Sequence, residues 1–136
     1  MAELLTAPYN GLPELVATES QFEAMLAELA AGSGPFAVDA ERASGFRYSA
    51  RAYLIQLFRR GGGLHLIDPI AINSDSAARE VIAELNEVIG STEVVIHAST
   101  QDLPCLREFG INPQSLFDTE LGARIAGCAR VGLGSL

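Results

Sequence analysis

Two carboxylates, separated by one residue, close an apolar run that is typical of a buried strand. Phe36 to Val38 is apolar, and Asp39 and Glu41 follow with only Ala40 between them. Successive side chains of a strand point to opposite faces, so Asp39 and Glu41 project from the same face. Two anions so placed repel each other unless a cation neutralises them. The pattern predicts a divalent metal site; the alternative is a strand that simply ends at the solvent edge.

A third acid, Asp102, lies in the first turn of the helix expected after the apolar segment 94–96. In an α/β fold a side chain there can reach the end of the sheet beside the strand that carries Asp39. Carboxylate oxygens suit Mg²⁺ and Mn²⁺, and two such ions about 3.5 to 4 Å apart can activate a water and stabilise the leaving oxygen of a phosphodiester. The alternative for Asp102 is a helix cap, with Ser99 as the N-cap residue.

The elements that would position these acids follow from hydrophobic periodicity and from glycine and proline breakers. We expect strands over 15–17, 36–41, 52–58, 64–67 and 94–96, with glycines 61–63 closing a hairpin. Helices are expected after a capping box of Ser20 and Glu23, after Asp75 or Ser76, from Ser99 to Phe109, and from Thr119 to Ala126 behind an Asp118 cap. One mixed sheet flanked by helices is the simplest packing of this order, which makes the fold class α/β.

Length and composition describe one globular domain over residues 1–136. Hydrophobic residues make up 49% of the chain and charged residues 19%, as expected of a chain that buries a core without disulfides or structural zinc. Cys105 and Cys128 lack the spacing of a zinc site and are interpreted as reduced thiols. No apolar run is long enough to cross a bilayer and acidic Glu3 is unlike a signal peptide, so we predict a cytoplasmic protein.

The net charge of −8 argues against a nucleic-acid-binding protein until its distribution is considered. Seven acids and no base precede Arg42, whereas the next nineteen positions hold five arginines: Arg42, Arg47, Arg51, Arg59 and Arg60. Arginine suits bidentate phosphate binding, and a solvated loop is the equal alternative.

Taken in order, several motifs resemble the exonuclease domain of ribonuclease D, a DEDD-type 3′-5′ exonuclease with a ribonuclease H-like fold. The resemblance covers about Phe36 to Gly127. Its motifs are Val38-Asp39-Ala40-Glu41, the arginine-rich loop to Arg51, Tyr53-Leu54-Ile55-Gln56-Leu57, Leu66-Ile67-Asp68-Pro69, His97-Ala98-Ser99-Thr100-Gln101-Asp102-Leu103 and Leu116-Phe117-Asp118-Thr119.

The resemblance implies roles for the acids. Asp39 would bridge two Mg²⁺ or Mn²⁺ ions, Glu41 would hold the ion that carries the attacking water, and Asp102 would bind at the second ion. The parent enzyme would process RNA, hydrolysing the last phosphodiester at a single-stranded 3′ end and releasing nucleoside 5′-monophosphates. The nucleic-acid contacts would come from the residues at matching positions and in the adjoining loop, namely Arg42, Arg47, Tyr48, Arg51, Gln56 and His97. His97 has a structural alternative, a hydrogen-bonded histidine at a strand end.

One departure from the family bears on activity. The family completes its site with a Tyr followed four residues later by Asp, and no Tyr occurs here after Tyr53. We therefore expect a C-terminally truncated piece of a longer protein, with weak or no turnover by itself and with uncovered apolar surface that favours self-association. Two alternatives stay open: a DNA exonuclease of the proofreading type, and a non-catalytic nucleic-acid-binding module of the same fold.

Overall fold

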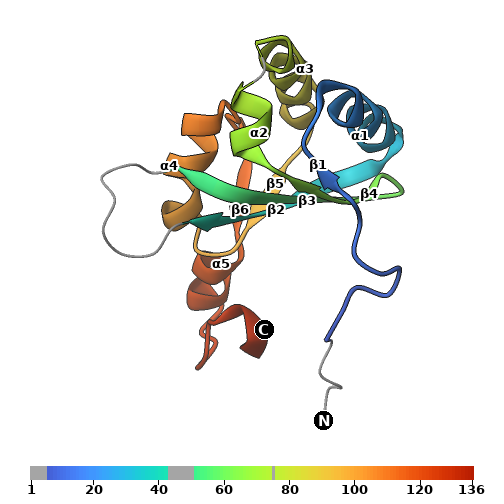
Figure 1. Cartoon of the computed structure of the whole chain (residues 1–136). Helices are drawn as coiled ribbons and strands as arrows, with labels where there is room; N and C mark the ends of the chain where they lie inside the picture. Colours follow the sequence, from blue (N-terminus) through green and yellow to red (C-terminus); the bar gives the residue numbers. More distant parts are fainter. Residues whose placement is uncertain (1–5, 43–50, 75) are drawn as a thin grey trace.

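The computed structural model describes residues 6–42, 51–74 and 76–136, which form a six-stranded mixed sheet with helices packed against it (Figure 1). The strands are β1 (Leu15–Val16), β2 (Ser33–Arg42), β3 (Ala52–Arg60), β4 (Gly63–Ile67), β5 (Val94–Ile96) and β6 (Leu116–Asp118). Their order across the sheet is β1-β4-β3-β2-β5-β6. The predicted α/β class and ribonuclease H-like mixed sheet are confirmed.

Strand β2 lies at the centre of the sheet. It pairs antiparallel with β3 and parallel with β5, and β3 continues antiparallel into β4. The predicted hairpin is confirmed, with Gly61 and Gly63 both at positive φ, a conformation that only glycine adopts without strain. The parallel pairing of β2 with β5 brings the segment after β5 to the carboxyl end of β2, where Asp39 and Glu41 lie.

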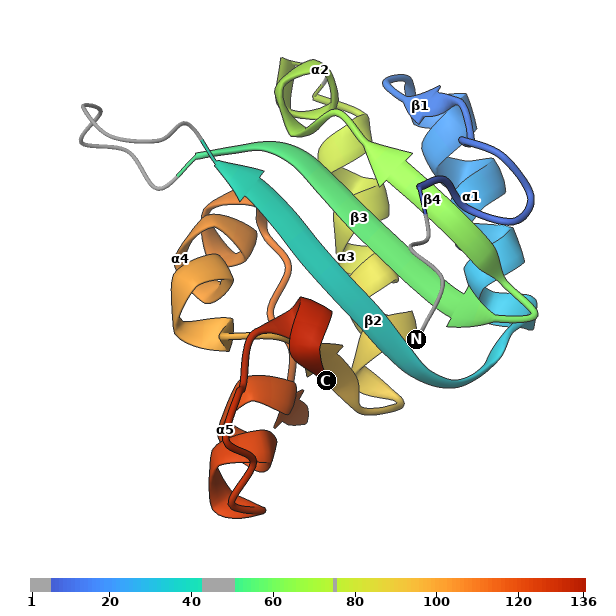
Figure 2. The same cartoon turned by 90° about the horizontal axis from the view of Figure 1, so that it is seen from below.

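The helices are α1 (Glu19–Ala31), α2 (Pro69–Ser74), α3 (Ala78–Gly90), α4 (Ser99–Phe109) and α5 (Thr119–Ile125), and a 3₁₀ turn, η1, spans Leu133–Ser135. Figure 2 shows α1, α2 and α3 behind β2, β3 and β4, so that view looks onto the opposite face of these strands. Within the described ranges, no helix combines the length and the apolar character needed to cross a membrane.

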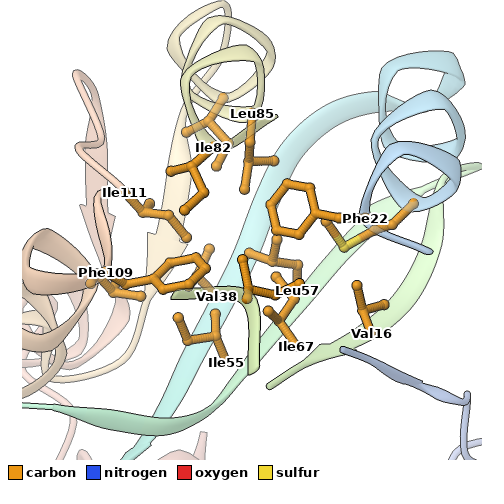
Figure 3. Packing of buried hydrophobic residues seen from close by; sticks show 14 of the residues in the cluster. Val16, Phe22, Val38, Ile55, Leu57, Ile67, Ile82, Leu85, Phe109 and Ile111 are labelled. Atoms are coloured by element: carbon orange, nitrogen blue, oxygen red, sulfur yellow. The ribbon is translucent and has the colours of Figure 1, made fainter. Parts of the chain in front are cut away.

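A single apolar core fills the space between the sheet and the helices. Val38, at 5% exposure, faces Ile82 and Leu85 of α3 and Phe109 of α4, and Phe22 of α1 packs beside them (Figure 3). Burial alternates along β2, where Phe36, Val38 and Ala40 are buried and Asp39 and Glu41 are exposed. Burial of the apolar set stabilises the strand register, because a one-residue slip would turn the acids into the core.

Several elements differ from the sequence prediction. Helix α3 begins at Ala78, behind Ala77, which makes no side-chain cap bond. Strand β6 was not predicted. The capping box of α1 is formed by Thr18 and Gln21 rather than by Ser20 and Glu23. Both pairs have the required spacing, but Thr18 has the extended backbone of an N-cap, and Ser20 already lies inside the helix. The short helix α2 was not predicted, although Asp68 before Pro69 is a recognised start signal and its carboxylate accepts from the amides of Ile70 and Ala71.

Arg59 has a structural role that the charge pattern did not indicate. It is 9% exposed, and its guanidinium donates to the carbonyl oxygens of Leu29 at 2.9 Å and of Gly34 at 3.1 Å. It also lies over the ring of Phe36, 4.7 Å from the ring centre. Arg59 therefore joins the end of α1 to the sheet, and this arginine is part of the packing rather than of a phosphate-binding cluster.

Candidate active site

Asp39 and Glu41 project from the exposed side of β2, as the alternation of the strand predicts. Asp39 lies directly across from Gln56 in the β2–β3 pairing, and the Gln56 side-chain amide donates to Asp39 Oδ2 at 3.2 Å. A carboxylate has two oxygens, so this bond does not use up the accepting capacity of Asp39. Gln56 therefore orients Asp39.

Asp102 lies against Asp39, although the two residues are sixty-three positions apart. Asp102 is 5% exposed, and its pKa is raised from the ordinary value of 3.8 to about 6. The causes are burial, the negative charge of Asp39, a hydrogen bond with Asp39 and the charge of Glu41, opposed by the positive charge of Arg42. Asp39 and Glu41 are thus both close enough to raise the pKa of Asp102.

The capping interpretation of Asp102 is wrong. Helix α4 begins at Ser99, so Asp102 is the fourth helical residue, and the N-cap position is taken by Ala98 with φ 53°. Ser99 itself donates through its hydroxyl to Asp118 Oδ2 at 2.7 Å instead of capping the helix. Asp102 therefore does not cap α4: its side chain contacts Asp39, and the amides at the start of α4 donate to another partner.

That partner is Asp118, whose carboxylate caps two helices at once. It accepts from the amides of Glu120 and Leu121 at the start of α5, as predicted, and from the amides of Ala98 and Ser99 at the start of α4. Burial opposes ionisation of Asp118, but these hydrogen bonds outweigh it and lower its pKa to about 2. Asp118 therefore holds the turn that carries Asp102, a role that sequence reasoning missed because the α4 amides are twenty residues away.

Arg42 follows Glu41 at the end of β2, and its side chain contacts Asp102. Its Nε lies 3.6 Å from Asp102 Oδ1, and its Nη2 donates to Gln101 Oε1 at 3.2 Å. The Arg42 side chain is 40% exposed, whereas that of Asp102 is 7% exposed. Arg42, predicted as a nucleic-acid contact, is therefore an ion-pair partner of the buried acid in this structure.

His97 and Gln56 line a cavity of about 260 Å³ beside Asp39. The remaining lining residues are mostly apolar: Ala37, Val38, Phe58, Leu64, Val95, Thr119 and Leu133. The His97 ring Nδ1 is 2.9 Å from the hydroxyl of Thr119, which fixes the imidazole as the structural interpretation expected. Thr119 and Phe58 also line this cavity, although sequence reasoning did not select them. The nearest sequence signal was the Leu116-Phe117-Asp118-Thr119 motif for Thr119 and the strand alternation for Phe58.

The other predicted nucleic-acid contacts divide into two groups. Arg47 and Tyr48 lie outside the described residues. Arg51 lines a different cavity, of about 540 Å³, with Asn73 and Arg79. The structure therefore does not bring Arg51 to the cavity beside Asp39.

Exposed apolar side chains lie on the last elements of the chain. Leu121 and Ile125 of α5 are exposed, as are Leu133 and Leu136. Self-association through this surface stays a prediction.

The donor set matches a divalent-cation site in type. Asp39 and Asp102 present hard carboxylate oxygens in contact, and burial together with the charges of Asp39 and Glu41 raises the pKa of Asp102. Among residues 6–42, 51–74 and 76–136, however, no group of three or more His, Cys, Asp and Glu side chains is close enough to hold a metal ion as it stands. The Arg42 guanidinium lies on one side of the Asp102 carboxylate, with Nε 3.6 Å from Oδ1.

Comparisons with known proteins address the whole arrangement. A family model described as 3′-5′ exonuclease matches residues 13–136. A crystal structure of a protein from Bifidobacterium adolescentis is 41% identical with TM-score 0.88, covering 96% of this chain and 31% of that one. The structure of Escherichia coli RNase D, described as an exoribonuclease involved in structured RNA processing, is 30% identical with TM-score 0.68, covering 88% of this chain and 30% of that one.

The Aedes aegypti Nibbler EXO domain shares the fold at 20% identity, with TM-score 0.70 over 94% of this chain and 62% of that domain. A search of curated protein sequences finds no match. The chain thus spans about a third of the length of the first two relatives.

Proposed function

Because this chain belongs to the DEDD-type 3′-5′ exonuclease family, we propose that it is the N-terminal portion of an exoribonuclease domain acting on single-stranded RNA 3′ ends. The observation that carries the proposal is the contact of Asp102 with Asp39, with Glu41 beside them. These are the three acids that the sequence motifs select. Resemblance to RNase D, at 30% identity, favours RNA over DNA as the substrate.

The reaction adds water across the terminal phosphodiester and releases a nucleoside 5′-monophosphate, leaving a new 3′-hydroxyl on the shortened RNA. Two Mg²⁺ or Mn²⁺ ions, when bound, would supply water activation and stabilise charge on the leaving oxygen. Asp39, Glu41 and Asp102 would hold these ions. Gln56 keeps Asp39 in orientation, and His97 with Thr119 forms a polar wall of the cavity that would receive the terminal nucleoside.

Thermal unfolding with Mn²⁺ tests the metal site without requiring turnover. At roughly ten times its Kd, Mn²⁺ is expected to stabilise the wild type by about 1.4 kcal/mol, which raises Tm by about 3 to 5 °C. Asp39→Ala removes the ligand expected to bridge both ions and is expected to abolish the rise. Glu23→Ala, an exposed acid on α1, is the control and keeps the full rise. An equal rise in Asp39→Ala contradicts the proposed site.

Binding of matched oligonucleotides separates RNA from DNA. We expect a single-stranded oligoribonucleotide to bind this chain about five- to tenfold more tightly than its deoxy counterpart in the presence of Mn²⁺, because the 2′-hydroxyl is a donor and acceptor that DNA lacks. Release of mononucleotides by this chain alone is expected to be slow or absent. Preference for the deoxy strand supports the proofreading alternative, and binding that ignores Mn²⁺ supports a non-catalytic module. Brisk release contradicts the expectation that further site residues are needed.

A further inference from the structure

Arg42 is the feature from which a further inference can be drawn. Within the described residues, it is the cation in contact with the acids of the site, through Asp102. The pairing of β2 with β3 is irregular at this point: Glu41 pairs with Leu54 and Arg42 with Ala52, so β3 has one extra residue. A bulge of this kind changes the direction of nearby side chains and often lies beside an active site.

Arg42 can leave its present partners, Asp102 and Gln101, for others. The N–O separation of 3.6 Å to Asp102 is longer than a close ion-pair hydrogen bond, and the second partner, Gln101, is neutral. The Arg42 side chain is 40% exposed, so its guanidinium can turn into solvent and stay hydrated. The acid that it contacts cannot move in the same way, since Asp102 is buried and lies against Asp39.

The charge balance of the site favours displacement of Arg42 from Asp102 when metal binds. Three carboxylates and one guanidinium give this cluster a formal charge of −2 with every acid ionised, and two divalent ions would make it +2. A divalent ion binds a carboxylate oxygen at about 2.0 to 2.6 Å. An ion on Asp102 Oδ1 would therefore lie within a few ångströms of the Arg42 guanidinium, and the two cations would repel each other.

We propose that Arg42 is a positioning residue that acts as the counter-ion of Asp102 in the metal-free protein and moves to a substrate phosphate when metal binds. This inference rests on the proposed function, because it takes Asp102 as a metal ligand. A guanidinium released beside the reacting centre has the planar, forked donor geometry that binds phosphate oxygens in pairs. Arg42 would thus lower metal affinity in the absence of RNA and raise RNA affinity in the presence of metal.

Calorimetric titration with Mn²⁺ tests whether Arg42 lowers metal affinity in the absence of RNA. Without RNA, Arg42→Gln is expected to bind Mn²⁺ about three- to tenfold more tightly than the wild type, since a competing positive charge is removed. Arg42→Lys keeps the charge and is expected to stay near the wild type. Arg60→Gln removes an exposed arginine at the other end of the β2–β3 pairing and is the charge-matched control.

Binding of a single-stranded oligoribonucleotide in saturating Mn²⁺ tests whether Arg42 raises RNA affinity when metal is bound. Arg42→Gln is expected to weaken this binding about five- to tenfold, and Arg42→Lys to weaken it by less, because lysine lacks the forked geometry. If Arg42 had a purely structural role, Arg42→Gln would bind both Mn²⁺ and RNA more weakly. The proposed exchange instead predicts tighter Mn²⁺ binding and weaker RNA binding in this variant.

The outcomes separate the two proposals. If the wild type does not bind Mn²⁺, the metal-ligand role of Asp102 fails, and with it the proposed function. If the wild type binds Mn²⁺ and Arg42→Gln binds it equally or more weakly, the counter-ion role is overturned while the proposed function stands. Unchanged RNA affinity in Arg42→Gln overturns the phosphate role.

Discussion

Asp102→Asn is expected to make the metal-free protein more stable at pH 7.5 by about 2 kcal/mol. Most mutations of a buried polar residue destabilise, but this carboxylate is held where its charge is unfavourable: its pKa is raised to about 6 by burial and by the neighbouring charge of Asp39. Asparagine has the same shape, carries no charge and can donate to Asp39 through its amide. Chemical denaturation of both proteins in EDTA measures the difference.

The pH dependence of this difference provides an internal check. The pKa of Asp102 in the folded protein lies above the value of 3.8 expected when it is unfolded, so the folded state binds the extra proton between these values. The wild type therefore loses stability as pH rises from 3.8 to about 6, and the cost is fully present above that range. The advantage of Asp102→Asn should vanish near pH 4. Glu108→Gln, an exposed acid on the same helix, should leave stability unchanged at both pH values.

The gain in stability should come with loss of the metal response. Asparagine binds Mn²⁺ far more weakly than a carboxylate does, so Asp102→Asn is expected to remove the Mn²⁺-dependent rise in Tm. A variant that is less stable than the wild type at pH 7.5 would show that the Asp102 charge is well accommodated by Arg42, contrary to this argument.

Asp118→Ala is expected to destabilise the protein by about 3 kcal/mol, because one substitution removes the acceptor for both helix N-termini. Asp118 accepts from two amides of α5, from the Ala98 and Ser99 amides and from the Ser99 hydroxyl. Ala98 also has positive φ, which costs energy in a non-glycine residue and is held in place by this contact. Urea denaturation at pH 7 measures the loss.

Two controls make this result specific. Asp68 accepts from two amides of α2 only, so Asp68→Ala should cost about 1 kcal/mol. The pKa of Asp118 is lowered to about 2, so its contribution is present above 3.8, the unfolded value, and is lost as pH falls through about 2. The gap between wild type and Asp118→Ala should therefore narrow below pH 4. Equal losses from the two aspartates would contradict the double-cap role of Asp118.

The sequence by itself determined the central strand and most of the order of elements, except α2 and β6, which were not predicted. Alternation of Phe36, Val38 and Ala40 with Asp39 and Glu41 fixes which side chains are buried, because the period of a strand is two and apolar burial stabilises only one register. The glycines of the hairpin and the stop of α4 at Gly110, with φ 113°, were predictable for the same local reason, since the required backbone conformation favours glycine. The ordered motifs also predicted the family, which the comparisons bear out.

Only the tertiary structure decided which partners each polar group finds. Arg59 was one of five clustered arginines in the sequence, yet it binds the carbonyl of Leu29, thirty residues away. Asp118 caps a helix that begins nineteen residues before it, and Arg42 pairs with Asp102 across sixty residues. Local patterns report periodicity and backbone preference, whereas an ion pair or a shared cap depends on which chain segments the sheet brings together. That physical difference explains why the three acids could be selected from sequence as candidate ligands, while the groups that hold them and balance their charge could not.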